Sequence, residues 1–124
     1  MKEELSIREK WAAMLLNGSI KQGRGLLQSQ RDTACCLGVL CLLYERETGE
    51  TLMRSSDGNI AGLLLPNVVR RWARLRTNSG ACEFGSLSFL NDGDPSESVP
   101  QLGFDQIADV ILCSETLFEK GKEI

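Results

Sequence analysis

Residues 21–25, Lys-Gln-Gly-Arg-Gly, place two cations and two glycines within five positions. Glycines let backbone amides approach an anion closely, and the guanidinium of Arg24 can bind phosphate through two parallel hydrogen bonds. The spacing differs from the GxxxxGK[ST] loop of nucleoside-triphosphate-binding proteins. The segment therefore predicts either a loop that binds a phosphate-bearing ligand or an ordinary solvated turn.

Two polar residues and two aromatic residues offer further contacts for such a ligand. Asn91 and Asp92 precede Gly93 in a sequence typical of a turn, and their side chains suit ribose hydroxyls or an adenine edge. Trp11 and Phe84 have charged or glycine neighbours, and an exposed ring at either position can stack on a purine. Packing at the edge of the core is an equal expectation for Trp11, and a plain turn is the alternative for Asn91 and Asp92.

Charge is divided unevenly along the chain. Residues 1–82 carry 12 basic and eight acidic side chains, whereas residues 83–124 carry two basic and nine acidic ones. The formal net charge of −3 argues against nucleic acid as a partner, and the arginines of residues 70–76 are expected on an exposed helix face. The asymmetry fits recognition of a phosphate-bearing small molecule, and it equally fits head-to-tail association of subunits.

Several kinds of chemistry are poorly served by this sequence. It contains no histidine, the usual group for proton transfer near neutral pH, and no recognisable pair of catalytic carboxylates. We therefore expect no enzymatic activity, no metal site and no cofactor. The five cysteines, of which Cys35 and Cys36 are adjacent, are expected to be buried free thiols. With no signal peptide and no apolar run long enough for a membrane span, we expect a cytoplasmic protein without a membrane partner.

The elements that must position these residues are expected to form one small α+β domain over residues 1–124, with about four helices and a short antiparallel sheet. Apolar spacing predicts helices over residues 5–17 and 35–47, a third from Pro66 and a last one from Phe104. In the second helix, Asp32 or Thr33 is the expected cap, and the inner side is formed by Cys36, Val39, Leu40 and Leu43.

Shorter elements are expected between these helices. Residues 26–28 suggest a strand, residues 51–65 a hairpin turning at 57–59, and residues 93–103 an exposed loop. Four aromatic residues lie within apolar patterns and are expected in the core, namely Tyr44, Trp72, Phe89 and Phe104.

An ordered set of motifs extends through nearly the whole chain. The set begins with WAAMLLNG at residues 11–18, KQGRG at 21–25 and CCLGVLC at 35–41. It continues with LP and VxxW in residues 65–72, LxxLND at 87–92 and FxxIAD at 104–109. In this order the motifs resemble those of the first family of phage Thoeris anti-defence proteins.

The resemblance implies a function without catalysis. Such proteins bind and sequester the cyclic ADP-ribose isomers made by bacterial TIR-domain enzymes, leave them intact, and so starve a downstream effector in the infected cell. They form homodimers with ligand pockets between protomers, and some form hexamers that also hold cyclic oligonucleotides. An acidic inhibitor that binds a host protein through the C-terminal third is the alternative function.

The resemblance also implies a set of ligand contacts. Trp11 matches the tryptophan of the first motif and Asn91 the asparagine of the LND motif, so both are expected near the adenine or ribose, together with Asp92. Arg24 is expected to face a phosphate. Arg54 and Phe84 fall where the family places an arginine and an aromatic contact. Residues 93–103 are longer than the corresponding family turn, so no contact is expected from the last helix.

Overall fold

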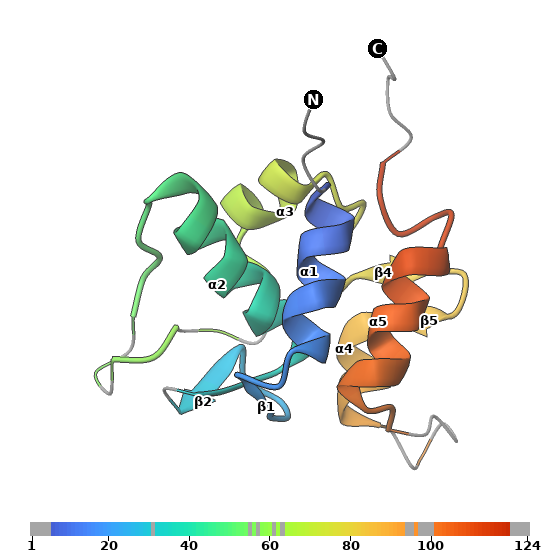
Figure 1. The fold of residues 1–124 in the computed structure, drawn as a ribbon, viewed down its shortest axis with the longest axis horizontal. Helices are drawn as coiled ribbons and strands as arrows, with labels where there is room; N and C mark the ends of the chain where they lie inside the picture. Colours follow the sequence, from blue (N-terminus) through green and yellow to red (C-terminus); the bar gives the residue numbers. More distant parts are fainter. Residues whose placement is uncertain are drawn as a thin grey trace.

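The computed structural model describes residues 6–30, 32–54, 56, 58–60, 62, 64–93, 96 and 101–119. The elements in chain order are α1 (Ile7–Leu16), β1 (Lys21–Gln22), β2 (Gln28–Gln30), β3 (Thr33–Ala34), α2 (Cys36–Thr48), α3 (Asn67–Ala73), β4 (Ala81–Cys82), β5 (Gly85–Ser86), α4 (Leu87–Asp92) and α5 (Phe104–Cys113). Helix α1 lies in the middle of the molecule and packs against α5 on one side and α2 on the other (Figure 1). The predicted small α+β fold is confirmed, with the short helix α4 in addition to the four predicted helices. None of the helices described here has the length and apolar character that a membrane crossing requires.

Helix α1 begins at a capping box. The Ser6 hydroxyl accepts a hydrogen bond from the Glu9 amide at 3.1 Å, and the Glu9 carboxylate accepts one from the Ser6 amide at 3.0 Å. The two bonds satisfy backbone donors that the first turn of a helix leaves free. The buried side of the helix is formed by Trp11, Ala12, Met14 and Leu15.

Helix α2 is the central core element, and its first half is buried on all sides. The predicted inner side is confirmed, because Cys36, Val39, Leu40 and Leu43 are fully buried. The absence of a side chain at Gly38 permits this burial. A Cβ atom at Gly38 would lie 1.7 Å from the carbonyl oxygen of Leu27, far inside any van der Waals contact. That carbonyl also accepts a hydrogen bond from the Cys35 amide at 3.2 Å, so the chain before β2 is tied to the start of α2.

The start of α2 differs from the prediction. The residue before the helix is Cys35, which makes no capping hydrogen bond through its side chain, whereas Thr33 lies in strand β3. Strand β3 is central in a three-stranded sheet of order β1-β3-β2, parallel to β1 and antiparallel to β2. The expected antiparallel sheet is therefore mixed, because residues 21–22 form a strand and not only a loop. A second sheet pairs β4 with β5.

Two other expected elements differ. Within the hairpin predicted over residues 51–65, the described residues form one antiparallel bridge, between Arg54 and Ile60, whereas residues 55, 57, 61 and 63, with Asp57 of the predicted turn among them, lie outside the described part of the chain. The expected turn at residues 91–93 is the end of helix α4, with Gly93 just after it. Leu87 and Leu90 bury one side of this helix, and that packing overrides the turn signal.

The aromatic residues only partly follow the prediction. Tyr44 is buried, whereas Trp72 and Phe104 are partly exposed at the edge of the core. The placement of Phe89 in the core is wrong, since 54% of this residue is exposed. The four positions therefore differ in depth although all lie in apolar stretches of sequence.

Candidate ligand-binding site

The side chain of Asn91, near the end of α4, joins this helix to residues 22–23 and to the start of α2. Its Oδ1 accepts hydrogen bonds from the Cys36 amide at 3.1 Å and from Nε2 of Gln22 at 3.0 Å. Its Nδ2 donates to the carbonyl of Gly23 at 2.8 Å and to Oδ1 of Asp92 at 2.9 Å. All the hydrogen-bonding capacity of the carboxamide is used, in a residue with 0% exposure. We call these bonded groups the Asn91 network.

Trp11 supports the same point of the chain from the other side. Its indole N–H donates to the carbonyl of Cys36 at 2.9 Å, so Trp11 and Asn91 bind the two backbone polar groups of one residue. The ring is fully buried and meets Phe118 edge-on, with centroids 6.5 Å apart. Of the two expectations for Trp11, packing in the core describes its position, and in the single chain the ring has no exposed face for stacking.

Arg24 and Asp92 lie at the outer edge of the Asn91 network. Asp92 is half-buried, and its Oδ1 accepts hydrogen bonds from the Gly25 amide at 3.0 Å and from Asn91. Arg24 is exposed, and its guanidinium donates to Oε1 of Gln101, a neutral partner. The motif loop of residues 21–25 and the LND motif therefore meet in space, and their described outer edge includes the guanidinium of Arg24 and the carboxylate of Asp92.

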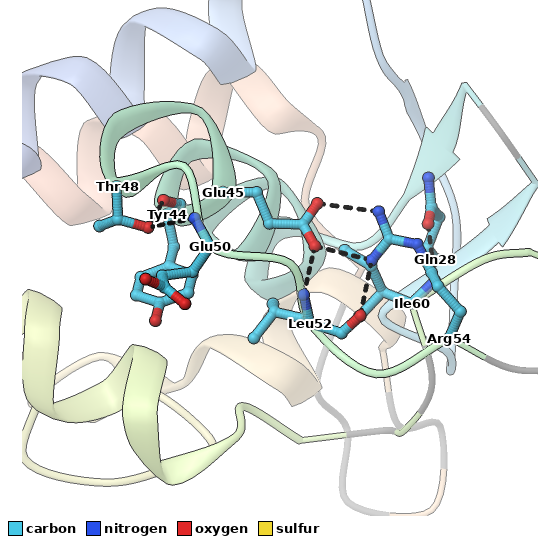
Figure 2. A network of polar contacts seen from close by, with 8 residues as sticks. All are labelled: Gln28, Tyr44, Glu45, Thr48, Glu50, Leu52, Arg54 and Ile60. Atoms are coloured by element: carbon cyan, nitrogen blue, oxygen red, sulfur yellow. Dashed lines mark hydrogen bonds and ion pairs between the residues drawn. The ribbon is translucent and has the colours of Figure 1, made fainter.

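Arg54 belongs to a different part of the molecule. Its guanidinium makes two hydrogen bonds of 2.8 Å to the carboxylate of Glu45, which also accepts the Leu52 amide at 2.6 Å (Figure 2). Burial raises the pKa of Glu45, but the hydrogen bonds from Arg54 and Leu52 outweigh it and hold this pKa below its ordinary value. This ion pair fastens the segment after α2 to the helix. The charge of Arg54 is already matched.

The same segment is tied down at its two ends (Figure 2). At one end the hydroxyl of Thr48 donates to the Tyr44 carbonyl at 2.8 Å and accepts from the Glu50 amide at 3.1 Å. At the other end the amide of Ile60 donates to Oε1 of Gln28 at 2.7 Å. The described part of residues 48–60 is thus held along α2 and β2 by polar contacts.

Phe84 lies in the turn between β4 and β5, and 53% of it is exposed. Its neighbour Glu83 has a definite role that the sequence did not suggest. The carboxylate of Glu83 accepts hydrogen bonds from the hydroxyls of Ser114 and Thr116, both at 2.6 Å, and from the Glu115 amide at 2.8 Å. These bonds, that from Ser114 first, hold the pKa of Glu83 well below its ordinary range.

The structure thus brings together only part of the predicted site. Arg24, Asn91 and Asp92 converge, and Trp11 reaches them through Cys36, while Arg54 and Phe84 lie on other elements. Gln22 and Gln101 complete the group, and sequence reasoning missed both as contacts. The Gln22 position could have been found from its place in the KQGRG motif, whereas nothing in the sequence marked Gln101.

The cysteines follow the prediction in part. Cys35, Cys36 and Cys41 are buried free thiols, and burial raises the pKa of each. Cys82 is partly exposed and Cys113 is exposed, so burial is wrong for Cys113. Among the described residues no three cysteine or acidic side chains are grouped as a metal site would require.

One protein family matches this chain. The model of a family described as a domain of unknown function (DUF8296) matches residues 1–115. No curated protein and no solved structure matches the chain. The matched range includes all six predicted ligand contacts and the whole of the Asn91 network.

Proposed function

We propose that this chain, which belongs to the DUF8296 family, is a non-catalytic binding protein that sequesters a nucleotide of the cyclic ADP-ribose class. The ligand class follows from the resemblance to phage Thoeris anti-defence proteins. In that role the protein acts in the cytoplasm of an infected bacterial cell and withholds an immune signal from its effector. The protein binds the signal without altering it, so that the intact ligand is released when the protein unfolds.

The observation that carries the proposal is the exposed edge of the Asn91 network. Arg24 presents a guanidinium whose bonded partner is a neutral glutamine, so its charge is available to a phosphate. Among the described residues, Asp92 accepts hydrogen bonds from Gly25 and Asn91 through Oδ1, which leaves Oδ2 for the hydroxyls of a ribose. A pyrophosphate-linked ribose presents both complementary groups within one small molecule.

The rigidity of the Asn91 network supports sequestration. Asn91, Gln22 and the backbone of Gly23 are fixed before any ligand arrives, so little conformational entropy is lost on binding. Arg24 is exposed and Asp92 only half-buried among the described residues, whereas slow release needs a closed pocket. A second copy of the chain would close it, and we therefore include a homodimer, or a hexamer, in the proposal.

Calorimetric titration with cyclic ADP-ribose isomers tests the proposal, with NAD and ADP-ribose as controls. We expect tight binding of at least one isomer and recovery of the intact ligand, by mass, after heat denaturation. Absence of heat with every isomer overturns the ligand class. Recovery of a cleaved product overturns the non-catalytic role. Retention of a host protein with no nucleotide bound would favour the alternative, an acidic protein inhibitor.

The variant Arg24→Gln tests the position of the site. We expect it to weaken nucleotide binding by about tenfold or more, since it removes a charge-assisted contact. Arg46→Gln is the matched control, because Arg46 is an exposed arginine on α2 with only a loose 3.8 Å contact to Glu47. Equal binding by Arg24→Gln and the wild type would place the site elsewhere. Trp11 and Asn91 are less suitable for this test, because both hold the fold together.

A further inference from the structure

A cavity of about 300 Å³ lies at the other end of helix α1, between the start of α1, the end of α3 and residues 118–119. In Figure 1 this is the upper end of the molecule, whereas β1 and β2 lie at the lower end. Its lining includes Arg8, Trp72, Arg74, Phe118 and Glu119. The volume is at the lower limit of small-molecule sites. We call this cavity the α3 pocket.

Two aromatic rings in the α3 pocket are held in place from behind. Trp72 packs edge-on against Tyr44, with centroids 5.3 Å apart and an angle of 78° between the ring planes. Phe118 packs edge-on against the buried Trp11, and the guanidinium carbon of Arg8 lies 4.6 Å from its ring centroid. Both rings are partly exposed. They therefore provide fixed apolar walls on which a flat ring can pack.

The two arginines of the pocket differ in what they bind. The guanidinium of Arg8 donates to the carbonyls of Ile111 at 2.6 Å and Ser114 at 2.9 Å, and so is committed to the end of α5. Arg74 is exposed, and among the described residues its side chain makes no hydrogen bond or ion pair. The nearby carboxylate of Glu119 lies 3.8 Å from Arg70 and is itself half-exposed. The α3 pocket therefore holds a fixed cation and a free one.

The backbone of Arg74 has a conformation that is uncommon for a residue other than glycine. Its φ of 65° and ψ of 34° are left-handed, and among the described residues Arg74 is the only non-glycine with a positive φ. The position closes α3, with the Arg74 amide on the Arg71 carbonyl at 3.2 Å and the Leu75 amide on the Arg70 carbonyl at 3.0 Å. Glycine is the residue that suits this position. The residue at this position is nevertheless an arginine, and it lines the pocket.

We propose that the α3 pocket is a second ligand site that takes a nucleoside monophosphate, with the base against Trp72 and Phe118 and the phosphate on Arg74. The rings match a planar heterocycle, and the free guanidinium matches a phosphate dianion. This site goes beyond the proposed sequestration at Arg24 and Asp92, because it uses different residues at the opposite end of α1. It stands or falls independently of that function.

Tryptophan fluorescence tests this site with adenosine 5′-monophosphate as the probe. Trp11 is buried in the core, so a ligand in the pocket changes mainly the emission of Trp72. We expect saturable quenching by the monophosphate, weaker binding of adenosine, and no quenching by inorganic phosphate alone. A wild-type protein whose emission does not change at millimolar monophosphate overturns the proposal.

The variant Arg74→Asn sharpens the test. Asparagine tolerates the left-handed backbone, so the variant keeps the helix end and loses the charge. We expect about a tenfold weaker affinity with a melting temperature no lower than that of the wild type. Arg71→Gln, an exposed arginine on the same helix that does not line the pocket, should bind like the wild type. Wild-type affinity in Arg74→Asn, or an equal loss in Arg71→Gln, contradicts a phosphate contact at Arg74.

Discussion

The polar side chains of Asn91, near one end of helix α1, and Arg74, near the other, differ in whether they are bonded within the chain. At the end followed by β1, Asn91 is buried and all its hydrogen-bonding groups have partners within the chain. At the end near α3, Arg74 is exposed and its side chain makes no bond to a described residue. The end that carries the KQGRG and LND motifs is thus the one at which Asn91 is committed to the fold. The buried carboxamide of Asn91 is used by the structure, so a ligand contact is better sought among exposed groups such as Arg24 and Arg74.

The variant Asn91→Ala should produce the largest change and tests whether the Asn91 network is structural. It removes the partner of the buried Cys36 amide and that of the partly buried Gly23 carbonyl, so we expect a loss of about 3 kcal/mol in the free energy of unfolding. Urea denaturation measures this loss. The exposed Gln30→Ala should stay within about 0.5 kcal/mol of the wild type. A fully stable Asn91→Ala protein would remove the difference between the two ends.

The sequence predicted elements more reliably than contacts, for a physical reason. The buried side of α2 follows from local periodicity, and Val39, Leu40 and Leu43 lie where the spacing places them. The Asn91 network depends instead on pairs such as Gln22 and Asn91, which are 69 positions apart. No local pattern contains that information. The LND turn signal was overridden for the same reason, since burial of Leu87 and Leu90 is decided by the rest of the fold.

The candidate site was predictable to the extent that its motifs were recognisable. Grouping Arg24 with Asn91 and Asp92 depended on the resemblance, and the structure places them together. Arg54 could not be assigned from sequence, because its partner Glu45 lies on a helix nine positions earlier and neutralises its charge only in the folded chain. Phe89 shows the same limit for burial, as an aromatic residue in an apolar stretch that faces outward.

Protonation of Glu83 at low pH should destabilise the end of the molecule near α3, because Glu83 anchors the segment that carries Phe118. The folded-state pKa of this carboxyl is lowered, first by the Ser114 hydroxyl and then by that of Thr116. Its contribution to stability is therefore complete above the ordinary glutamate pKa of about 4.3 and is lost as the pH falls below it. We expect the stability of the wild type to fall over this range more steeply than that of Glu83→Gln. Urea midpoints at a series of pH values measure the slopes, and parallel curves for the two proteins would contradict the role of Glu83.

The smallest expected effect, and the one opposite in sign, belongs to Arg74→Gly. Glycine relieves the left-handed strain at the end of α3, which for other residues is about 1–2 kcal/mol, while it makes the unfolded chain more flexible by about 0.5–1 kcal/mol. The net change in the free energy of unfolding should therefore lie between zero and a gain of about 1 kcal/mol, and a shift of the urea midpoint to higher concentration measures it. The same substitution removes the free cation of the α3 pocket. We therefore expect Arg74→Gly to lose affinity for the monophosphate while its stability is kept or increased. Marked destabilisation by Arg74→Gly would show that the Arg74 side chain stabilises the fold. Asn91 and Arg74, at the two ends of α1, would then both be structural.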